Sequence, residues 1–286
     1  KNIAWDTEKK AYYVTLYYGR NSNGKAIRKT KTVSNLKDAK KILKDHNRQI
    51  AAGTAIPPSP ELFTQYAENF LQFKAISCSE TTNYGYSNIF KNHLSPYFQD
   101  KRLSDISARD IQDYITFKVN SGLKVKTVKK HVNLLYSILE NATKQRIIHD
   151  NPVKLVEKLR PEDSLKNFLN TEEASLLCQK VTDSQLEIPV KLALLLGLRR
   201  GEVLGLKWDH IDFASATVRI VNTRTEAGHD IIEKRPKTDS SIRVLRICDS
   251  LLSALKKHKK FQESVFERMG TRTNFVCTMD NGKPFD

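Results

Sequence analysis

A proline-rich stretch about one fifth of the way along the chain limits how the chain can fold. Pro57, Pro58 and Pro60 have no backbone N–H and hold the residues before them extended, so neither a helix nor a central strand can run through them. We therefore expect a stiff linker at 56–60, with separate domains before and after it. A second linker is expected at 159–167. With 286 residues, 39% of them hydrophobic, the chain is long enough for two or three domains with their own cores.

Residues 1–55 are predicted to form a small β-β-β-α domain. The segment 11–18 is rich in aromatic and β-branched residues, and 25–33 alternates between basic and other residues, as a strand with one solvated face does. Ser34 is predicted to cap a helix that Gly53 ends. That helix is needed because a three-stranded sheet is only marginally stable alone.

The net charge of +16 indicates a polyanionic partner, and much of it lies near the N-terminus. Residues 1–55 carry 13 Lys and Arg against 4 Asp and Glu, which gives +9. Basic side chains on an exposed sheet face, with tyrosines among them, suit phosphate contacts and insertion into a DNA groove; an ordinary solvated surface is the alternative. The candidate DNA-binding residues of this domain are Arg20, Lys25, Arg28, Lys29 and Lys31.

Residues 61–158 have the apolar spacing of an all-helical domain. We predict helices over 62–73 and 82–98, a helix that begins at Ser107, and a long helix over 124–148. Basic residues gather at the start of the long helix, where they can face a DNA backbone or form a solvated face. These residues are Lys124, Lys126, Lys129, Lys130 and His131.

Residues 168–286 are predicted to form a mixed α/β domain, mainly helical with a small antiparallel sheet. Thr171 is the expected cap of its first helix, since Glu172 and Glu173 follow in the first turn, where carboxylates suit the helix dipole. The other predicted elements are strands at 216–221, 242–247 and 274–277 and a helix at 249–268.

An apolar run at 188–198 predicts a buried helix in this third domain, and charged residues follow it at once. The run stops near Gly197, and Arg199, Arg200 and Glu202 come next. A guanidinium fixed at the mouth of a buried helix suits bidentate capture of a phosphate or a carboxylate. The alternative is a simple Arg–Glu ion pair within one helical turn.

Residues 197–208, followed by 209–213, resemble the first-arginine box of the tyrosine recombinases, the phage and conjugative-transposon integrases. The box is Gly-Leu-Arg, two residues, Glu, and an apolar run that ends near a Trp and an acidic-Ile-Asp turn. Leu196 stands where many relatives have Thr. The segment 1–55 also resembles the arm-binding domain of these integrases, and 61–158 resembles their core-binding domain. The resemblance implies a multidomain α+β protein that ends in a catalytic domain.

The resemblance also implies a reaction, namely metal-independent transfer of a DNA strand without a cofactor. A tyrosine attacks the scissile phosphate and forms a 3′-phosphotyrosyl bond. Arg199 would neutralise charge on the non-bridging oxygens, with Glu202 orienting it or closing the turn, and Arg200 is the competing clamp. Lys237, on a β-hairpin, would protonate the departing 5′ oxygen. Its Lys-Thr match favours it over Lys234, Arg235 and Arg243, while a basic hairpin that only touches phosphate is the alternative.

Three further parts of the family pattern are not recognisable: a His-x-x-Arg box, a second His or Trp, and the nucleophilic tyrosine. All ten tyrosines lie at or before Tyr136, and the sequence after His258 has no arginine in the required place. We therefore expect the chain to be truncated within its catalytic domain, to bind DNA and to form no covalent adduct with it. A DNA-binding regulator that kept the fold is the alternative function. A metal-dependent nuclease would need clustered carboxylates, which the sequence around Arg199 lacks.

The expected partner is double-stranded DNA at arm-type and core crossover sites, on which the protein would assemble as a dimer or tetramer. The resemblance also implies accessory DNA-bending or directionality proteins as further partners. Four widely spaced cysteines and no long apolar run fit a cytoplasmic protein with reduced thiols, and no metal site is expected. The resemblance implies that the protein is bacterial and acts on DNA.

Overall fold

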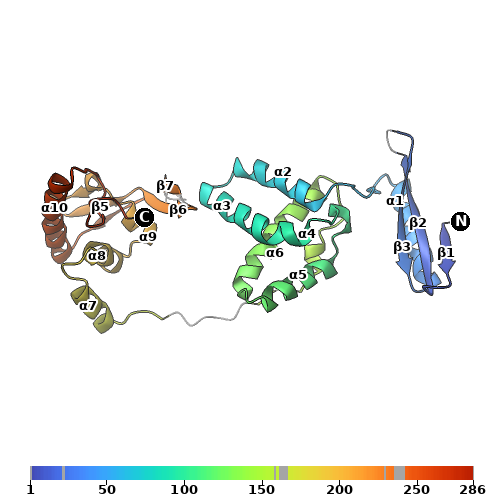
Figure 1. The fold of residues 1–286 in the computed structure, drawn as a ribbon, viewed down its shortest axis with the longest axis horizontal. Coiled ribbons are helices and arrows are strands. Elements are labelled where there is room, and N and C mark those ends of the chain that lie inside the picture. The colour runs from blue at the N-terminus through green and yellow to red at the C-terminus, as the bar shows by residue number, and fades with distance from the viewer. Residues whose placement is uncertain are drawn as a thin grey trace. The chain divides into compact units, whose positions relative to one another are not determined.

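The computed structural model describes residues 2–20, 23–157, 159–160, 167–228, 230–234 and 242–285 (Figure 1). The chain divides into two compact units, Lys1–Asp163 and Ser164–Asp286. The predicted catalytic Lys237 and its neighbour Arg235 lie outside the described residues. In the described ranges, no helix is both long and apolar enough to cross a membrane.

The first unit begins with an antiparallel sheet in the order β1 (Ile3–Asp6), β2 (Ala11–Arg20) and β3 (Ala26–Val33), followed by α1 (Leu36–Ala51). Its small core consists of Val14, Leu16 and Ala39. The helix is capped by Asn35, whose side chain accepts the backbone N–H of Asp38 at 2.7 Å. The predicted cap, Ser34, was therefore one residue too early. Gly53 follows the helix with φ +66, as predicted for a stop.

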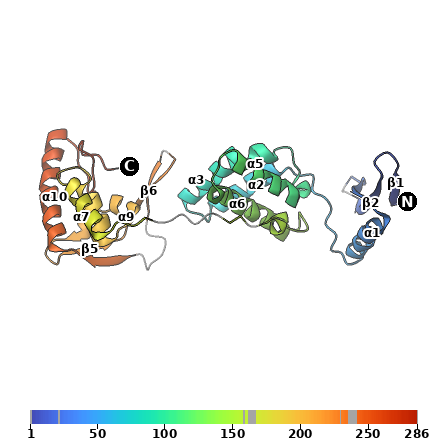
Figure 2. The same cartoon turned by 90° about the horizontal axis from the view of Figure 1, so that it is seen from below.

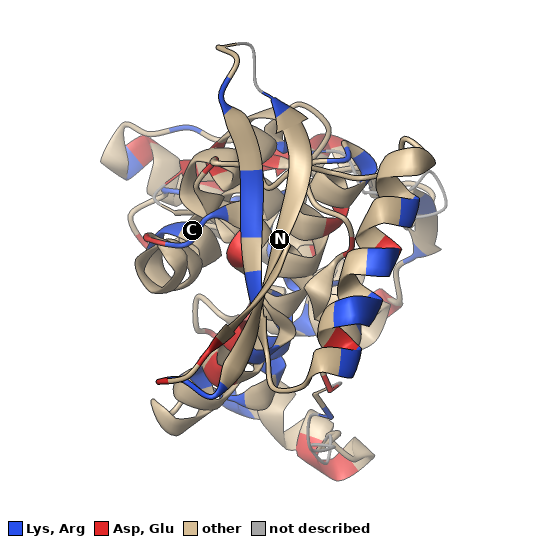
Figure 3. Ribbon diagram, turned by 90° about the vertical axis from the view of Figure 1, so that its right-hand side faces the viewer, with Lys and Arg blue, Asp and Glu red and all other residues tan. Residues whose placement is uncertain are grey.

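Strand register divides the predicted DNA-binding residues between the two faces of this sheet. Lys29 pairs with Leu16 and Lys31 with Val14, so both point to the face that carries the core. Arg28 pairs with Tyr17 on the opposite, open face. The prediction of one basic face was wrong because basic residues occupy consecutive positions of β3, and consecutive side chains alternate. Arg20 and Lys25 lie at the end of the β2–β3 hairpin, and further Lys residues line α1 (Figure 3).

The rest of the first unit is a helical bundle, as predicted. Its elements are α2 (Phe63–Ala75), α3 (Glu80–Ile89), the π-helical η1 (Phe90–Leu94), α4 (Ser95–Phe98), η2 (Leu103–Asp105), α5 (Ala108–Asn120), α6 (Val125–Lys144) and η3 (Pro152–Leu155). The predicted helix at 82–98 thus begins two residues earlier and contains a π-helical turn. The predicted helix start at Ser107 is confirmed: Ser107 caps α5, and its backbone N–H donates to the carboxylate of Asp110. The long helix ends at Lys144, four residues before its predicted end, and the chain then turns through Arg146 at φ 57.

The second unit combines helices with two small sheets. Its helical elements are α7 (Thr171–Lys180), α8 (Glu187–Leu196), α9 (Arg200–Leu204), η4 (Trp208–His210) and α10 (Asp249–Met269). Strands β4 (Ile211–Asp212), β5 (Thr217–Ile220) and β8 (Arg243–Arg246) form one antiparallel sheet, and β6 (Thr223–Ala227) and β7 (Asp230–Lys234) form a hairpin. Helix α10 packs against α8 over a core that includes Leu192, Leu251 and Val276. Figure 2 shows α10 along one edge of this unit.

Several predictions for the second unit need correction. Asn170, not Thr171, caps α7, because its side chain and that of Glu173 bond reciprocally to each other's backbone N–H. Helix α8 is only partly buried, since Leu194 and Leu195 are exposed. Residues 274–277 form no strand. Phe275 makes an isolated bridge with Lys207, flanked by backbone hydrogen bonds from Trp208 to Asn274 and from Val276 to Leu206. Strands β5 and β8 and helix α10 confirm the remaining elements.

Candidate active site

The local fold places Arg199 at the start of a short helix and points it to solvent. Gly197 ends α8 in the left-handed conformation, with φ 63. A residue with a side chain would adopt this conformation only with backbone strain. Leu198 is buried and fixes the next residue of the chain. Arg199 then adopts an extended conformation as the N-cap of α9, and its side chain is 76% exposed. The predicted first arginine is therefore held by a rigid turn while its guanidinium stays accessible.

Glu202 lies beneath Arg199 and is 2% exposed. Its Oε2 accepts the backbone N–H of Arg199 at 2.9 Å, and its Oε1 accepts Nη1 of Arg199 at 3.1 Å. Arg243, the first residue of β8, donates Nη1 to Oε1 at 3.0 Å and Nη2 to Oε2 at 2.9 Å. Each carboxylate oxygen of Glu202 thus accepts two hydrogen bonds, which satisfies a buried charge.

This arrangement keeps Glu202 ionised and leaves a net positive charge at the surface. The two hydrogen bonds from Arg243, together with those from Arg199, lower the pKa of Glu202 to about 2, although burial acts in the opposite direction. Two guanidinium groups against one carboxylate give a charge of +1. Because Arg243 is 28% exposed and Arg199 is 76% exposed, that charge is most accessible at Arg199. The cluster can therefore bind an anion such as a phosphate.

Arg243 is the residue of this cluster that the sequence did not identify as a partner of Glu202. The sequence places it only among the three basic residues that compete with Lys237 for the role of general acid. Arg243 and Glu202 are 41 positions apart in the sequence, Glu202 on a helix and Arg243 on a strand. Only the alternation of β8, in which Arg243 and Leu245 are the less exposed residues, gives a signal that Arg243 points inward.

Two glycines bring α9 into direct backbone contact with the β6–β7 hairpin. A Cβ at Gly205 would lie 2.9 Å from the backbone nitrogen of Arg224, and a Cβ at Gly201 would lie 3.1 Å from the carbonyl oxygen of Arg224. Arg200, the competing clamp, lies on this side, and its Nη2 is 3.5 Å from Glu226 of β6. The turn thus directs Arg199 to Glu202 and Arg200 to the hairpin.

Other predicted site residues lie elsewhere or are not described. Lys237 falls between β7, which ends at Lys234, and β8, which begins at Arg243. Lys124, Lys126, Lys129 and Lys130 are exposed at the start of α6. Lys29 contacts Asp105 at 2.9 Å within the first unit. In the part of the chain that the structure describes, no three His, Cys, Asp or Glu residues are close enough to share a metal ion.

His131, which the sequence grouped with these lysines, belongs instead to the core of the bundle. It is 1% exposed, and its Nδ1 lies 2.9 Å from the hydroxyl of Tyr114. The helical stripe places it on the same side as Val128 and Leu135, away from the exposed lysines.

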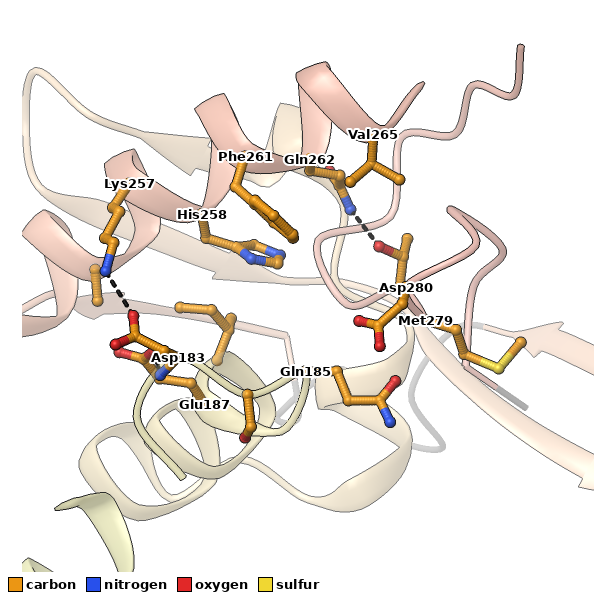
Figure 4. A pocket seen from close by; sticks show the side chains of 14 residues that line it. Asp183, Gln185, Glu187, Lys257, His258, Phe261, Gln262, Val265, Met279 and Asp280 are labelled. Carbon is orange, nitrogen blue, oxygen red and sulfur yellow. Dashed lines mark hydrogen bonds and ion pairs between the residues drawn. The ribbon is translucent and has the colours of Figure 1, made fainter. Parts of the chain in front are cut away.

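The second unit also contains a cavity of about 260 Å³ between α8, α10 and the segment near Thr278 (Figure 4). The ion pair of Lys257 with Asp183, at 2.7 Å, lies at one end of it. His258 lines this cavity, and it is held by a 2.8 Å hydrogen bond to the carbonyl of Val276. Burial lowers the pKa of His258. The cavity does not include Arg199, Glu202 or Arg243 among its lining residues.

Comparison with known proteins shows which proteins the chain is similar to. Residues 62–119 match the family model of the phage integrase N-terminal SAM-like domain. Over 97% of the chain, the sequence is 27% identical to a tyrosine recombinase XerC-like protein of Caldanaerobacter subterraneus subsp. tengcongensis, of which it covers 75%. The chain is thus similar to a tyrosine recombinase along almost its whole length. It is also 30% identical to the ICEBs1 integrase of Bacillus subtilis, over 64% of this chain and 50% of that protein.

Solved tyrosine recombinase structures share the fold. The Tn1549 transposon integrase, in complex with a circular intermediate DNA, matches with a TM-score of 0.66 and 17% identity, over 79% of this chain and 73% of that one. A lambda integrase dimer bound to a COC′ core site matches with a TM-score of 0.55 and 14% identity, over 100% of this chain and 76% of that one. These likenesses confirm the predicted mixed α/β tyrosine recombinase fold with small antiparallel sheets.

Proposed function

We propose that this protein is a site-specific DNA recombinase that cleaves and rejoins DNA strands through a 3′-phosphotyrosyl intermediate. The observation that carries the proposal is the fixed but accessible guanidinium of Arg199. One of its nitrogens is held by Glu202, and among the described residues its other donors have no protein partner, so they are available to a phosphate. The similarity to a tyrosine recombinase XerC-like protein and to the phage integrase SAM-like domain supports this reaction class.

In this proposal the residues of the cluster have separate roles. Arg199 neutralises charge that develops on the non-bridging oxygens of the scissile phosphate. Glu202 orients Arg199 and transfers no proton, because a carboxyl with a pKa of about 2 stays ionised at neutral pH. Lys237 protonates the departing 5′ oxygen, and the reaction needs no metal. The nucleophile is a tyrosine.

We infer that the partner is duplex DNA, on which the protein assembles as dimers or tetramers in the bacterial cytoplasm. A lambda integrase tetramer bound to a Holliday junction shares the fold. The exposed lysines at the start of α6 are the proposed contacts to the crossover site, and the basic residues of 1–55 are the proposed contacts to arm-type sites. The charge of +16 supports both.

The test uses the protein as its gene encodes it and a nicked crossover-site duplex that traps the covalent intermediate. We expect a protein–DNA adduct on denaturing gels from the wild type. Arg199→Ala should abolish the adduct but leave DNA binding within about twofold, because one phosphate contact is a small part of a large interface. Arg200→Ala removes the same charge one residue away and serves as the matched control.

Three results would contradict parts of the proposal. Equal loss of binding and cleavage in Arg199→Ala would favour a structural ion pair. Loss of the adduct in Arg200→Ala alone would show that Arg200, and not Arg199, binds the scissile phosphate. Specific DNA binding by the wild type without any adduct would favour the alternative, a DNA-binding regulator with an integrase fold.

A further inference from the structure

Glu202 has two arginine partners, and they play unequal parts in its geometry. Arg243 faces the carboxylate with a parallel pair of hydrogen bonds, one to each oxygen. Such a bidentate pair fixes the plane of the carboxylate as well as its position. The side chain of Arg199, by contrast, reaches Glu202 through Nη1 alone. Arg243 therefore determines how Glu202 is oriented, and Glu202 determines how Arg199 is oriented.

We propose that Arg243 is a positioning residue that acts on the scissile phosphate through Glu202 and Arg199. This inference rests on the proposed function. Arg243 does not need to touch DNA: it turns the carboxylate so that Oε1 meets Nη1 of Arg199. It also balances the charge of Glu202, so that the charge of Arg199 is available to the phosphate.

The position of Arg243 in the chain gives it a second effect. It is the first residue of β8, and Lys237 lies six positions before it. The hydrogen bonds to Glu202 therefore attach the start of β8 to α9, the helix that begins at Arg199. One buried carboxylate links the proposed phosphate clamp to the strand that follows the proposed general acid. A misplacement of about 1 Å in such a group can lower a rate by roughly a hundredfold.

The experiment compares Arg243→Gln with Arg246→Gln in the protein as its gene encodes it. Arg246 is exposed on the same strand and has no ion pair among the described residues, so both variants lose one positive charge from β8. With the nicked duplex in a single turnover, we expect Arg243→Gln to cleave at least about tenfold more slowly and to bind DNA within about twofold of wild type. Arg246→Gln should cleave as wild type. Unchanged cleavage by a folded Arg243→Gln would overturn the proposal.

Two further measurements separate positioning from folding. Arg243→Lys keeps the charge but cannot span both oxygens, so its cleavage rate should fall between those of wild type and Arg243→Gln. In Arg243→Gln, Glu202 loses the interaction that contributes most to keeping it ionised. As the pH is lowered, cleavage by this variant should therefore begin to fall at a higher pH than cleavage by wild type. If Arg243→Lys cleaves as slowly as Arg243→Gln, and if the pH profile of Arg243→Gln is the same as that of wild type, the role of Arg243 is purely structural.

A nuclear magnetic resonance measurement distinguishes failure of this inference from failure of the proposed function. The Nε–H signal of Arg199, assigned by its absence in Arg199→Lys, reports the guanidinium without DNA or a nucleophile. It should shift in Arg243→Gln and Arg243→Lys but not in Arg246→Gln. If the wild type forms no adduct while this pattern holds, the recombinase function fails and the positioning geometry stands. If the signal does not move, the positioning role is wrong even in an active enzyme.

Discussion

The imidazole of His131 on α6 stacks on the imidazole of His93 in the π-helical η1, with 4.4 Å between the ring centroids. The hydroxyl of Tyr114 lies 2.9 Å from Nδ1 of His131, and Nζ of Lys118 lies 3.5 Å from Nδ1 of His93. Two imidazoles and an ammonium thus share one site inside the helical bundle. Burial, then His93 and Lys118, lower the pKa of His131 to about 4, so the pair is neutral at pH 7.

The helical bundle should consequently lose stability in mild acid. The unfolded chain binds a proton at His131 near pH 6.5, but the folded chain binds it only near pH 4, so stability is complete above pH 6.5 and falls between these values by about 3 kcal/mol. The measurement is hydrogen exchange of α5 and α6 in wild type and in Tyr114→Phe/His131→Leu, each at pH 7 and pH 4.5. Protection in the variant should improve relative to wild type at the lower pH. A constant difference between the two proteins would show that His131 is not the cause.

The second unit should respond to acid through Glu202, but at a lower pH. Its pKa is lowered from 4.5 to about 2 on folding, so the stabilisation is complete above pH 4.5 and is lost as the pH falls towards 2, by about 3 kcal/mol. Urea unfolding followed by Trp208 fluorescence in a Trp5→Phe background reports this unit. Glu202→Gln should be less stable at pH 7 and lose less stability below pH 4.5. Glu263→Gln, which removes an exposed carboxylate of α10, should keep the acid dependence of the parent.

Gly205→Ala should destabilise the second unit by about 1–3 kcal/mol. The new methyl group would lie against the backbone of Arg224, which cannot move away without moving the rest of the hairpin. Gly85→Ala is the matched substitution in α3, where nothing lies within 4 Å of the added Cβ. It should stabilise its helix by up to about 1 kcal/mol. Urea unfolding by circular dichroism measures both. A neutral Gly205→Ala would mean that the hairpin adapts to the methyl group.

DNA binding should depend on β3 more than on α1. Arg28→Ala/Lys31→Ala and Lys41→Ala/Lys44→Ala each remove two exposed positive charges from the first domain. Arg28 and Lys31 lie on opposite faces of β3, which is an edge strand of the sheet. If this edge contacts one phosphate from each face, only the first pair should reduce the slope of log binding constant against log salt, by about 1.8. Fluorescence anisotropy with arm-type duplexes over a salt series gives both slopes. A larger change of this slope in Lys41→Ala/Lys44→Ala would show that α1, and not β3, carries the DNA-binding surface.

The sequence predicted those parts of the site that depend on neighbouring residues. The turn at Gly197 and the accessible Arg199 follow from a local pattern, and so do the cap at Ser107 and helix α10. Cap positions were wrong by one residue where two cap-forming residues are adjacent, as at Ser34 and Asn35. In such cases the choice depends on which side chain reaches the third backbone N–H, and composition does not determine it.

The parts that the sequence could not predict depend on register and on distant pairing. The faces of Lys29 and Lys31 follow from which residue of β2 each one opposes. The bond from Arg243 to Glu202 depends on how β8 pairs with β5 and on where that sheet lies against α9. The β6–β7 hairpin was missed because its strands carry mostly polar residues, without the alternation that marks a half-buried strand.

The glycine contact between α9 and β6 has a mechanical consequence. Neighbouring elements usually adjust to each other through side chains that change rotamer, but α9 presents no side chain at Gly201 and Gly205, where the backbone of Arg224 lies against it. A displacement of the hairpin should therefore be passed to α9, and through it to Arg199. Any partner that bends the β6–β7 hairpin would therefore also displace Arg199.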